Sequence, residues 1–296
     1  MPPAVRSSSR SRLAAYVALT KPRIIELLLV TTVPTMVVAQ RGLPPLGLIL
    51  ATLVGGALAA GGANALNMYV DRDIDRLMHR TRGRPLVTGE ISPSEAFRFA
   101  VALEVVAFVE LWVLVNPLSA VLALSATLFY VFVYTIWLKR TSTQNIVIGG
   151  AAGAVPVLVG WAAVTNRLDW APLVLFGVIF AWTPPHFWAL AIRYREDYAT
   201  AAVPMLPAVA SLAVTARRIL GYTFALWATT LLFYWVGRMG AIYLLAALVL
   251  GGLFVWHATQ LARDSTPQRA MRLFGYSITY VSLLFGAMAV DQLILR

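Results

Sequence analysis

The polar series Asn67-Met-Tyr-Val-Asp71-Arg-Asp-Ile-Asp75 interrupts a largely apolar chain. Asn67, Asp71 and Asp75 are four residues apart, so an α-helix would align their side chains along one stripe about 12 Å long. Amide and carboxylate oxygens suit Mg²⁺, which proteins usually bind through one or two carboxylates together with substrate phosphates. The series therefore predicts a magnesium site formed by these three residues.

Basic residues surround this series. Arg72, Arg80 and Arg84 lie within or just after it, and Lys139 follows a later apolar stretch. The guanidinium fork of arginine binds phosphate oxygens through paired hydrogen bonds, and carboxylates with arginines together are typical of a site for Mg²⁺ and a diphosphate. We therefore expect these four basic residues to bind the substrate.

The composition indicates a protein that resides in lipid. Of 296 residues, 59% are hydrophobic and 12% are charged, whereas soluble domains carry roughly 25% charged residues. This excludes an ordinary soluble domain and a disordered chain. The chain has no cysteine, which excludes disulfides, thiolate metal sites and cysteine nucleophiles.

Stretches of about 20 mostly apolar residues predict membrane helices. We find nine such stretches, at 24–40, 45–69, 94–115, 117–137, 145–163, 170–192, 216–236, 240–260 and 272–293. The predicted fold is an all-α integral membrane bundle of about nine transmembrane helices. We expect residues 1–20 to be a disordered cytoplasmic tail and residues 21–296 to be a single domain.

The basic residues predict the orientation of the bundle. All but four of the 24 lysines and arginines fall on one side of these spans, and cytoplasmic loops collect such residues. The exceptions are Arg41, Arg167, Arg238 and Arg296. The N-terminus is therefore expected in the cytoplasm and the C-terminus on the other side. Because topology accounts for most of the net charge of +11, no nucleic-acid partner is needed.

The polar series and its surroundings resemble the UbiA-type intramembrane prenyltransferases. The resemblance rests on Thr20-Lys21-Pro22-Arg23, on the stretch from Asn67 to Gly89, and on two later segments, Trp182-Thr-Pro-Pro-His186 and Arg193-Tyr-Arg-Glu-Asp197. It extends over nearly the whole chain. It implies a transmembrane prenyltransferase that uses Mg²⁺ bound by Asn67, Asp71, Asp75 and Asp197, which are also the expected catalytic residues.

The chain is most similar to the branch of this family whose acceptor is haem B. The resemblance implies transfer of a farnesyl group from farnesyl diphosphate to a haem vinyl group, with haem B as a substrate rather than a cofactor. The product, haem O, is a precursor of haem A for terminal oxidases, which implies haem A synthase as a partner. The implied location is the bacterial inner membrane, with the active site on the cytoplasmic face; a mitochondrial inner membrane is the alternative.

One departure from the family pattern bears on the acceptor. Family members carry a second Asp-x₃-Asp motif, and here the corresponding positions are Arg193 and Asp197. An arginine beside the acceptor would suit the two propionates of haem. Arg193, Arg195, Tyr194 and His186 are therefore expected to bind substrate, and a helix-packing role for His186 remains an equal alternative.

Two other functions remain open. One is a UbiA-type enzyme with a phenolic or quinone-precursor acceptor, against which Arg193 and the segment 182–207 argue. The other is a cation-coupled transporter. Transporters bind near the middle of the bilayer, whereas the acidic residues here gather at one membrane face, which favours an enzyme.

Overall fold

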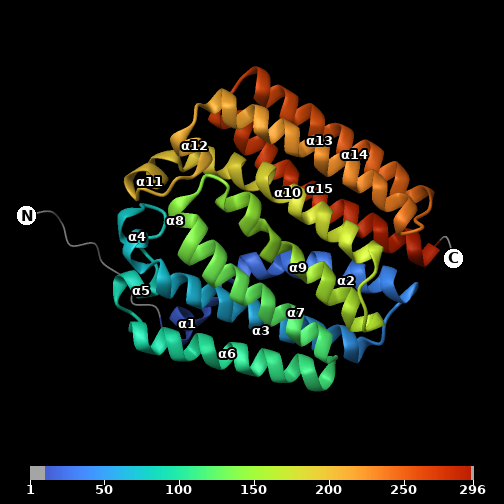
Figure 1. Ribbon diagram of the computed structural model, residues 1–296, viewed down its shortest axis with the longest axis horizontal. Coiled ribbons are helices and arrows are strands. Elements are labelled where there is room, and N and C mark those ends of the chain that lie inside the picture. The colour runs from blue at the N-terminus through green and yellow to red at the C-terminus, as the bar shows by residue number, and fades with distance from the viewer. Residues whose placement is uncertain (1–10, 295–296) are drawn as a thin grey trace, which may run out of the picture.

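The computed structural model describes residues 11–294, with only the backbone for residues 23–29. All regular structure in this part of the chain is helical (Figure 1). The long helices are α2 (Pro22–Gln40), α3 (Leu46–Val70), α6 (Pro93–Leu114), α9 (Asn145–Thr165), α10 (Trp170–Arg193), α13 (Leu212–Val236), α14 (Ala241–Arg263) and α15 (Pro267–Ile294). A ninth long segment joins α7 (Pro117–Leu128), the π-helix η1 (Phe129–Leu138) and α8 (Lys139–Thr141).

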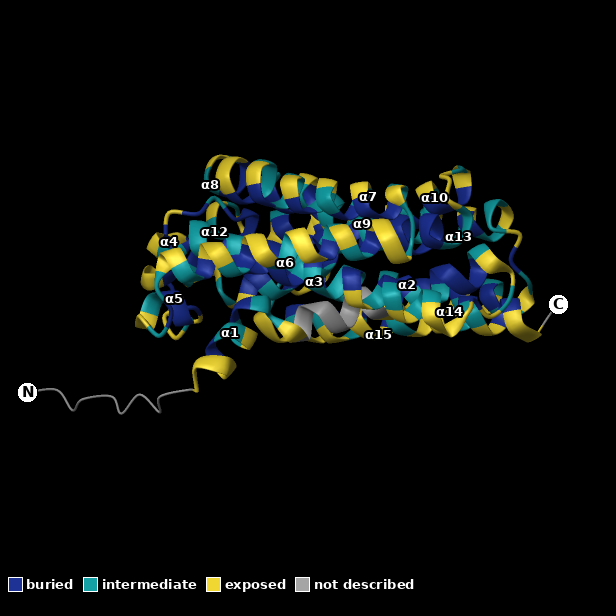
Figure 2. Cartoon of the chain, turned by 90° about the horizontal axis from the view of Figure 1, so that it is seen from below, coloured by how far each residue is buried: buried dark blue, intermediate teal, exposed yellow. Residues whose placement is uncertain are grey.

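The long helices coincide with the nine predicted spans. Within residues 11–294, seven of them are long and apolar enough to cross a membrane. Exposed positions lie along the outer faces of the helices (Figure 2), and many of them carry large apolar side chains, as a lipid-facing surface requires. The protein is therefore an integral membrane protein. The total of nine spans stays a prediction, because α6 carries Arg98, Glu104 and Glu110, and the described apolar stretch in α2 is only Val30–Gln40.

Two helices start earlier than their predicted spans, 216–236 and 272–293. α13 begins at Leu212 and α15 at Pro267, so both extend beyond the apolar stretch. The first turn of α15 contains Arg269, whose charge ended the apolar stretch without ending the helix. The start of α13 is set by Ser211, whose hydroxyl accepts from the Val214 N–H. Hydropathy reports the apolar stretch, whereas the helix ends where its capping residues lie.

The helix starts follow familiar capping rules. α6 begins with a capping box, in which the Ser92 hydroxyl accepts from the Glu95 N–H while the Glu95 carboxylate accepts from the Ser92 N–H. Asn116 caps α7, with its side chain accepting from the Ser119 N–H at 2.8 Å. These caps stabilise the starts of α6 and α7.

The expectation of a disordered tail over residues 1–20 is wrong for its second part. Arg12–Thr20 form helix α1, which Ser11 caps and which packs on α3 through the buried Ala15 and Leu19. This helix is too short to span a membrane, so the search for long apolar stretches missed it. Residues 1–10 lie outside the described part of the chain.

The long helices pack side by side, and the short ones gather at one end of the bundle. α9, α10, α13, α14 and α15 share the largest core cluster with α2, while α3 packs along α6. The short helices α4 (Arg72–Leu77), α5 (Pro85–Thr88), α11 (Arg195–Thr200) and α12 (Leu206–Val209) lie with α8 at the end away from the C-terminus (Figures 1 and 2). This arrangement brings both predicted polar segments to the same end.

Candidate active site

Two polar stripes face each other where α3 meets the π-helical segment. Asn67 Nδ2 donates to Thr135 Oγ1 at 3.2 Å, and Lys139 Nζ donates to the Asp71 carboxylate. All four side chains are buried, Asp71 and Thr135 completely. Because residues 67 and 71 are four apart, as are 135 and 139, the stripes pair residue by residue along both helices.

The stripe of Asn67, Asp71 and Asp75 forms as predicted, although the helix axis changes within it. α3 ends at Val70 and α4 begins at Arg72. The backbone hydrogen bonds from Asp71 to Asn67 and from Asp75 to Asp71, both 2.9 Å, keep the four-residue repeat across the junction. The Asn67 amide also donates to Asp71 Oδ2 at 2.7 Å.

Arg84 provides the cation for the far end of this stripe. Its Nη1 lies 2.5 Å from Asp75 Oδ2, and the Asp75 side chain is only 3% exposed. The loop before α5 returns to α4, since the Thr81 hydroxyl donates to the Asp75 carbonyl at 2.9 Å. Of the basic residues predicted to bind substrate, Arg84 and Lys139 therefore contact the acidic stripe directly.

Lys21 completes the polar group and was not among the predicted site residues. Its Nζ donates to Asn67 Oδ1 at 2.8 Å. Its backbone is left-handed, with φ = 54°, in the turn that joins α1 to α2. Burial, together with the charges of Arg84 and Lys139, holds the pKa of Lys21 well below its usual value. The Lys-Pro sequence just before the first apolar stretch was the available signal.

Arg140 is a second residue that sequence reasoning left to topology alone. Both of its terminal nitrogens lie 2.7 Å from the Asp73 carboxylate, and Nη2 lies 3.8 Å from Asp71 Oδ1. Bidentate pairing of this kind lowers the pKa of Asp73 to about 2. Asp73 therefore serves to hold α8 against α4, on the outer side of the buried stripe.

Asp197 lies beside the site rather than within the acidic stripe. Its carboxylate accepts the backbone N–H groups of His79 at 3.3 Å and Arg80 at 3.1 Å, and so joins α11 to the loop after α4. Among the described residues, no three His, Cys, Asp or Glu side chains are grouped closely enough to hold a metal ion. The structure therefore does not assemble Asp197 with Asp71 and Asp75, because its oxygens are occupied by the loop backbone.

The remaining basic candidates lie outside the buried stripe. Arg80 donates to the Tyr198 hydroxyl at 3.0 Å and lies over the rings of Tyr194 and Tyr198. Arg72 turns back to the Tyr69 carbonyl, at 2.6 Å. Arg193 and Arg195 are exposed, and the Arg193 guanidinium lies 5.9 Å from the Tyr194 ring. None of these four side chains forms a hydrogen bond or ion pair with Asn67, Asp71 or Asp75 among the contacts of the described residues.

His186 lies within α10, one helix away from the acidic stripe. Its ring stacks on Trp182 with centroids 4.2 Å apart and touches Phe274, while Nδ1 lies 2.7 Å from the Ser277 hydroxyl. Trp182 Nε1 donates to the Ser277 carbonyl at 2.8 Å. His186 therefore packs against its neighbours through its ring faces and Nδ1. Nε2 is the ring nitrogen that could contact a substrate.

The donor atoms of the stripe suit Mg²⁺ and a diphosphate. Asp71 Oδ1 is buried and accepts no hydrogen bond from any described residue. Such a carboxylate oxygen is costly without a partner, and a hard cation satisfies it. Asn67, Asp71 and Asp75 would hold the ion, with Lys21, Arg84 and Lys139 placed to meet phosphate oxygens.

Comparison with known proteins identifies the family. Residues 28–285 match the model of the UbiA prenyltransferase family. A protein named protoheme IX farnesyltransferase from Streptomyces coelicolor is 54% identical, over 95% of this chain and 91% of its own length. A protein of the same name from Clavibacter michiganensis is 55% identical, over 95% and 92%. The chain belongs to the UbiA prenyltransferase family.

Solved structures share the fold at much lower identity. A digeranylgeranylglyceryl phosphate synthase superposes with a TM-score of 0.78 at 17% identity, covering 95% of this chain and 98% of that one. A UbiA homologue from Archaeoglobus fulgidus, bound to GPP and Mg²⁺, gives 0.62 at 16% identity, covering 93% and 99%. These matches support the all-helical membrane fold.

Proposed function

We propose that this protein transfers a farnesyl group from farnesyl diphosphate to a vinyl group of haem B, giving haem O. The observation that carries the proposal is the buried group of Asn67, Asp71 and Asp75, matched by cations from three other segments of the chain. The acceptor is inferred from relatives named protoheme IX farnesyltransferase, which are 54–55% identical over nearly the full length.

The donor half of the reaction needs neutralisation of charge. When the carbon–oxygen bond breaks, its electron pair leaves with the diphosphate. Lys21, Arg84 and Lys139 are placed to stabilise that charge, and their burial strengthens the interaction because water screens it little. Mg²⁺ held by Asn67, Asp71 and Asp75 would supply Lewis-acid chemistry at the phosphate oxygens. The A. fulgidus homologue bound to Mg²⁺ and GPP supports a requirement for Mg²⁺.

The acceptor half forms a carbon–carbon bond. The haem vinyl group attacks the allylic carbon, water captures the resulting cation, and a proton leaves, so that diphosphate and haem O are the products. We place the propionates near Arg193 and Arg195, with Tyr194 beside the reacting chain and His186 Nε2 facing the haem. Ring faces such as that of Tyr194 stabilise a passing cation.

We further propose a bacterial inner-membrane location, with the Asp71 end of the bundle in the cytoplasm. Most basic residues lie at that end, as the positive-inside rule requires. Asp197, joined to the loop that carries Arg80 and Arg84, would contribute to the same site through that loop. Haem A synthase is the proposed recipient of the product, because haem O is a precursor of haem A.

A direct assay tests the proposal. Purified protein is supplied with farnesyl diphosphate, Mg²⁺ and haem B, and the extracted pigment is analysed by mass. Farnesylated, hydrated haem is expected, and chelation of the metal should abolish it. The same assay with a phenolic acceptor distinguishes the alternative: prenylated phenol without farnesylated haem would overturn the acceptor assignment and leave the prenyltransferase class intact.

A further inference from the structure

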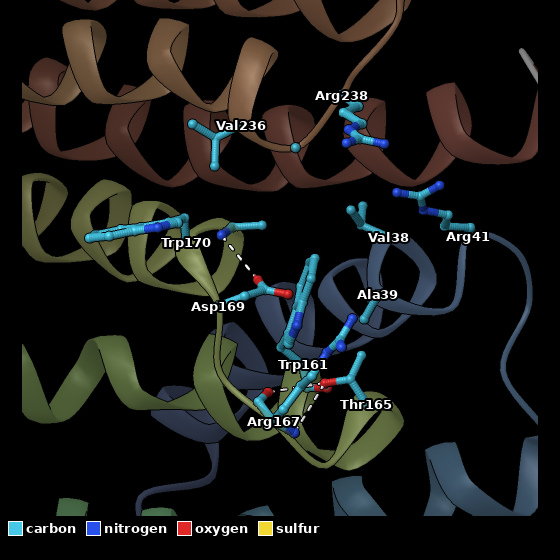
Figure 3. Close-up of a pocket in the computed structure, with 12 residues that line it drawn as sticks. Val38, Ala39, Arg41, Trp161, Thr165, Arg167, Asp169, Trp170, Val236 and Arg238 are labelled. Carbon is cyan, nitrogen blue, oxygen red and sulfur yellow. Dashed lines mark hydrogen bonds between the residues drawn. The ribbon is translucent and has the colours of Figure 1, made fainter.

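A cavity opens at the end of the bundle opposite the Asp71 site. It measures about 310 Å³ and lies between the end of α2, the α9–α10 turn and the α13–α14 turn (Figure 3). Arg41, Arg167 and Arg238 all line it. These are the three described residues among the four basic residues that lie against the positive-inside rule, and all three meet at one cavity.

The backbone of two of these arginines is unusual. Arg41 has φ = 56° and Arg238 has φ = 51°, each just after a helix C-terminus. In both turns the next residue, Gly42 or Met239, donates its N–H to a carbonyl five residues back, at 3.1 Å and 2.9 Å. Glycine is the usual residue in the left-handed position of such a turn, because it has no Cβ.

A glycine is adjacent to each arginine in the sequence, yet the arginine has the left-handed backbone. Gly42 follows Arg41 and Gly237 precedes Arg238, and neither has a left-handed backbone. Both turns therefore carry a guanidinium at a position that costs backbone stability. Strained backbone conformations of this kind gather at functional sites, where a side chain is needed in one place.

The turn that carries Arg238 is also anchored from another helix. The Asp291 carboxylate of α15, which is only 2% exposed, accepts the N–H of Gly240 at 2.6 Å and of Tyr243 at 3.1 Å. The carboxylate thereby caps α14 and holds the α13–α14 turn in place. Among the described residues, Asp291 forms no ion pair with an arginine.

The cavity itself has an excess of positive charge. Among the described residues that line it, Asp169 is the one acidic residue, and its side chain accepts the Ala171 N–H at 3.2 Å. The ends of α2, α9 and α13 add partial negative charge, which three guanidiniums exceed. The indole N–H of Trp161, which is 8% exposed, meets no hydrogen-bond acceptor among the described residues.

The chemistry of the walls defines the class of ligand. Arginines bind carboxylate or phosphate oxygens, while Trp161 and the exposed Trp170 provide apolar ring surfaces at the depth where membrane proteins place tryptophan. The volume is at the lower end of ligand pockets, so it suits a headgroup whose apolar body stays in the lipid.

We propose that this cavity binds the phosphate or carboxylate headgroup of an anionic amphiphile, at the membrane face opposite the prenyl-transfer site. An anionic phospholipid and the propionates of a haem both present that chemistry. Non-specific attraction of arginines to a lipid surface would not require three chain segments to meet at one cavity. It would also not require two arginines to adopt a left-handed backbone, which glycine adopts at lower cost.

The left-handed backbone at Arg41 and Arg238 allows both side chains to be removed without loss of stability. The double variant Arg41→Gly, Arg238→Gly removes two guanidiniums and places glycine where it is preferred, so it should fold at least as well as the wild type. Asn166→Gly is the matched control, because Asn166 also has a left-handed backbone (φ = 52°) after α9 and carries no charge.

Delipidated proteins are unfolded thermally in neutral detergent with phosphatidylglycerol, or with phosphatidylcholine of the same chains. Phosphatidylglycerol should raise the melting temperature of the wild type and of Asn166→Gly by about 2–5 °C more than phosphatidylcholine does, and the double variant should lose most of that difference. Native mass spectrometry should show the matching loss of bound phosphatidylglycerol.

Haem B and its dimethyl ester, whose propionates are blocked, form the second arm. If haem B raises the melting temperature more than its dimethyl ester does, and only the double variant loses this difference, the propionates are the ligand. If the double variant loses only the shift caused by phosphatidylglycerol, the ligand is a lipid. The proposal is overturned if the double variant keeps the full effect of both anions, or if the wild type responds to neither. Both outcomes are independent of prenyl transfer.

Discussion

Lys139 and Asp71 form an ion pair from which water is almost excluded, with side chains 9% and 0% exposed. They come from segments 68 residues apart. Burial of such an ion pair costs free energy, because both charges lose their hydration. Removal of one partner costs more, because the remaining buried charge then has no counterion. The proposed function accounts for this pair, because a diphosphate would contact both Lys139 and a metal ion held by Asp71.

Substitution of the carboxylate tests this arrangement. Asp71→Asn removes a ligand from the stripe and leaves the Lys139 charge without its counterion. We expect turnover of farnesyl diphosphate to fall by roughly a hundredfold or more. Asp73→Asn is the matched control, since the Asp73 carboxylate is 59% exposed and pairs only with Arg140. Equal losses in the two variants would contradict the assignment.

Lys21 is expected to bind the diphosphate through its Nζ, because a bound anion favours the protonated amine and so offsets the effect of burial on its pKa. Lys21→Met keeps the length of the side chain and removes the charge, so the KM for farnesyl diphosphate should rise by roughly 10- to 100-fold. Lys21→Arg keeps the charge and should recover part of that loss. If Lys21→Met leaves steady-state kinetics unchanged, the Lys21–Asn67 contact is structural only.

His186 is expected to meet haem through Nε2. His186→Phe keeps a ring between Trp182 and Phe274, so packing is retained while the ligand atom is lost. The visible absorption spectrum of bound ferric haem B should change, and its affinity should fall by about tenfold or more. Ser277→Ala removes the partner of Nδ1 and the hydroxyl's hydrogen bond to the Phe274 carbonyl but leaves Nε2 in place, so the spectrum should stay close to that of the wild type.

Two adjacent glycines in α14 provide a test of packing. A Cβ at Gly251 would lie 2.0 Å from Trp227 Cδ1, and the indole is held by its hydrogen bond to the Ala247 carbonyl. Gly251→Ala should therefore destabilise the protein by about 1–3 kcal/mol. Gly252→Ala meets nothing within 4 Å and should be neutral or stabilising, by up to about 1 kcal/mol. Thermal unfolding in detergent separates the two results.

Sequence patterns predicted the long helices well, because apolar stretches of membrane length carry a strong signal. Helix α1 and the contact of Lys21 with Asn67 were missed. The reason is that a nine-residue helix has no membrane signature, and contacts 46 residues apart leave no local pattern. Local spacing placed Asn67, Asp71 and Asp75 on one stripe, whereas it gave no sign that Asp197 is used by the backbone of the neighbouring loop.

The π-helical turns of η1 limit how this protein can change during evolution. The Thr135 hydroxyl donates to the Tyr130 carbonyl, five residues back, and the wider turn sets the direction of every residue that follows. Each residue of an α-helix turns the chain by about 100°. Deletion of one residue within Phe129–Leu138 would therefore rotate Lys139 and Arg140 away from α3. We expect this segment to accept many substitutions among relatives, while its length stays constant.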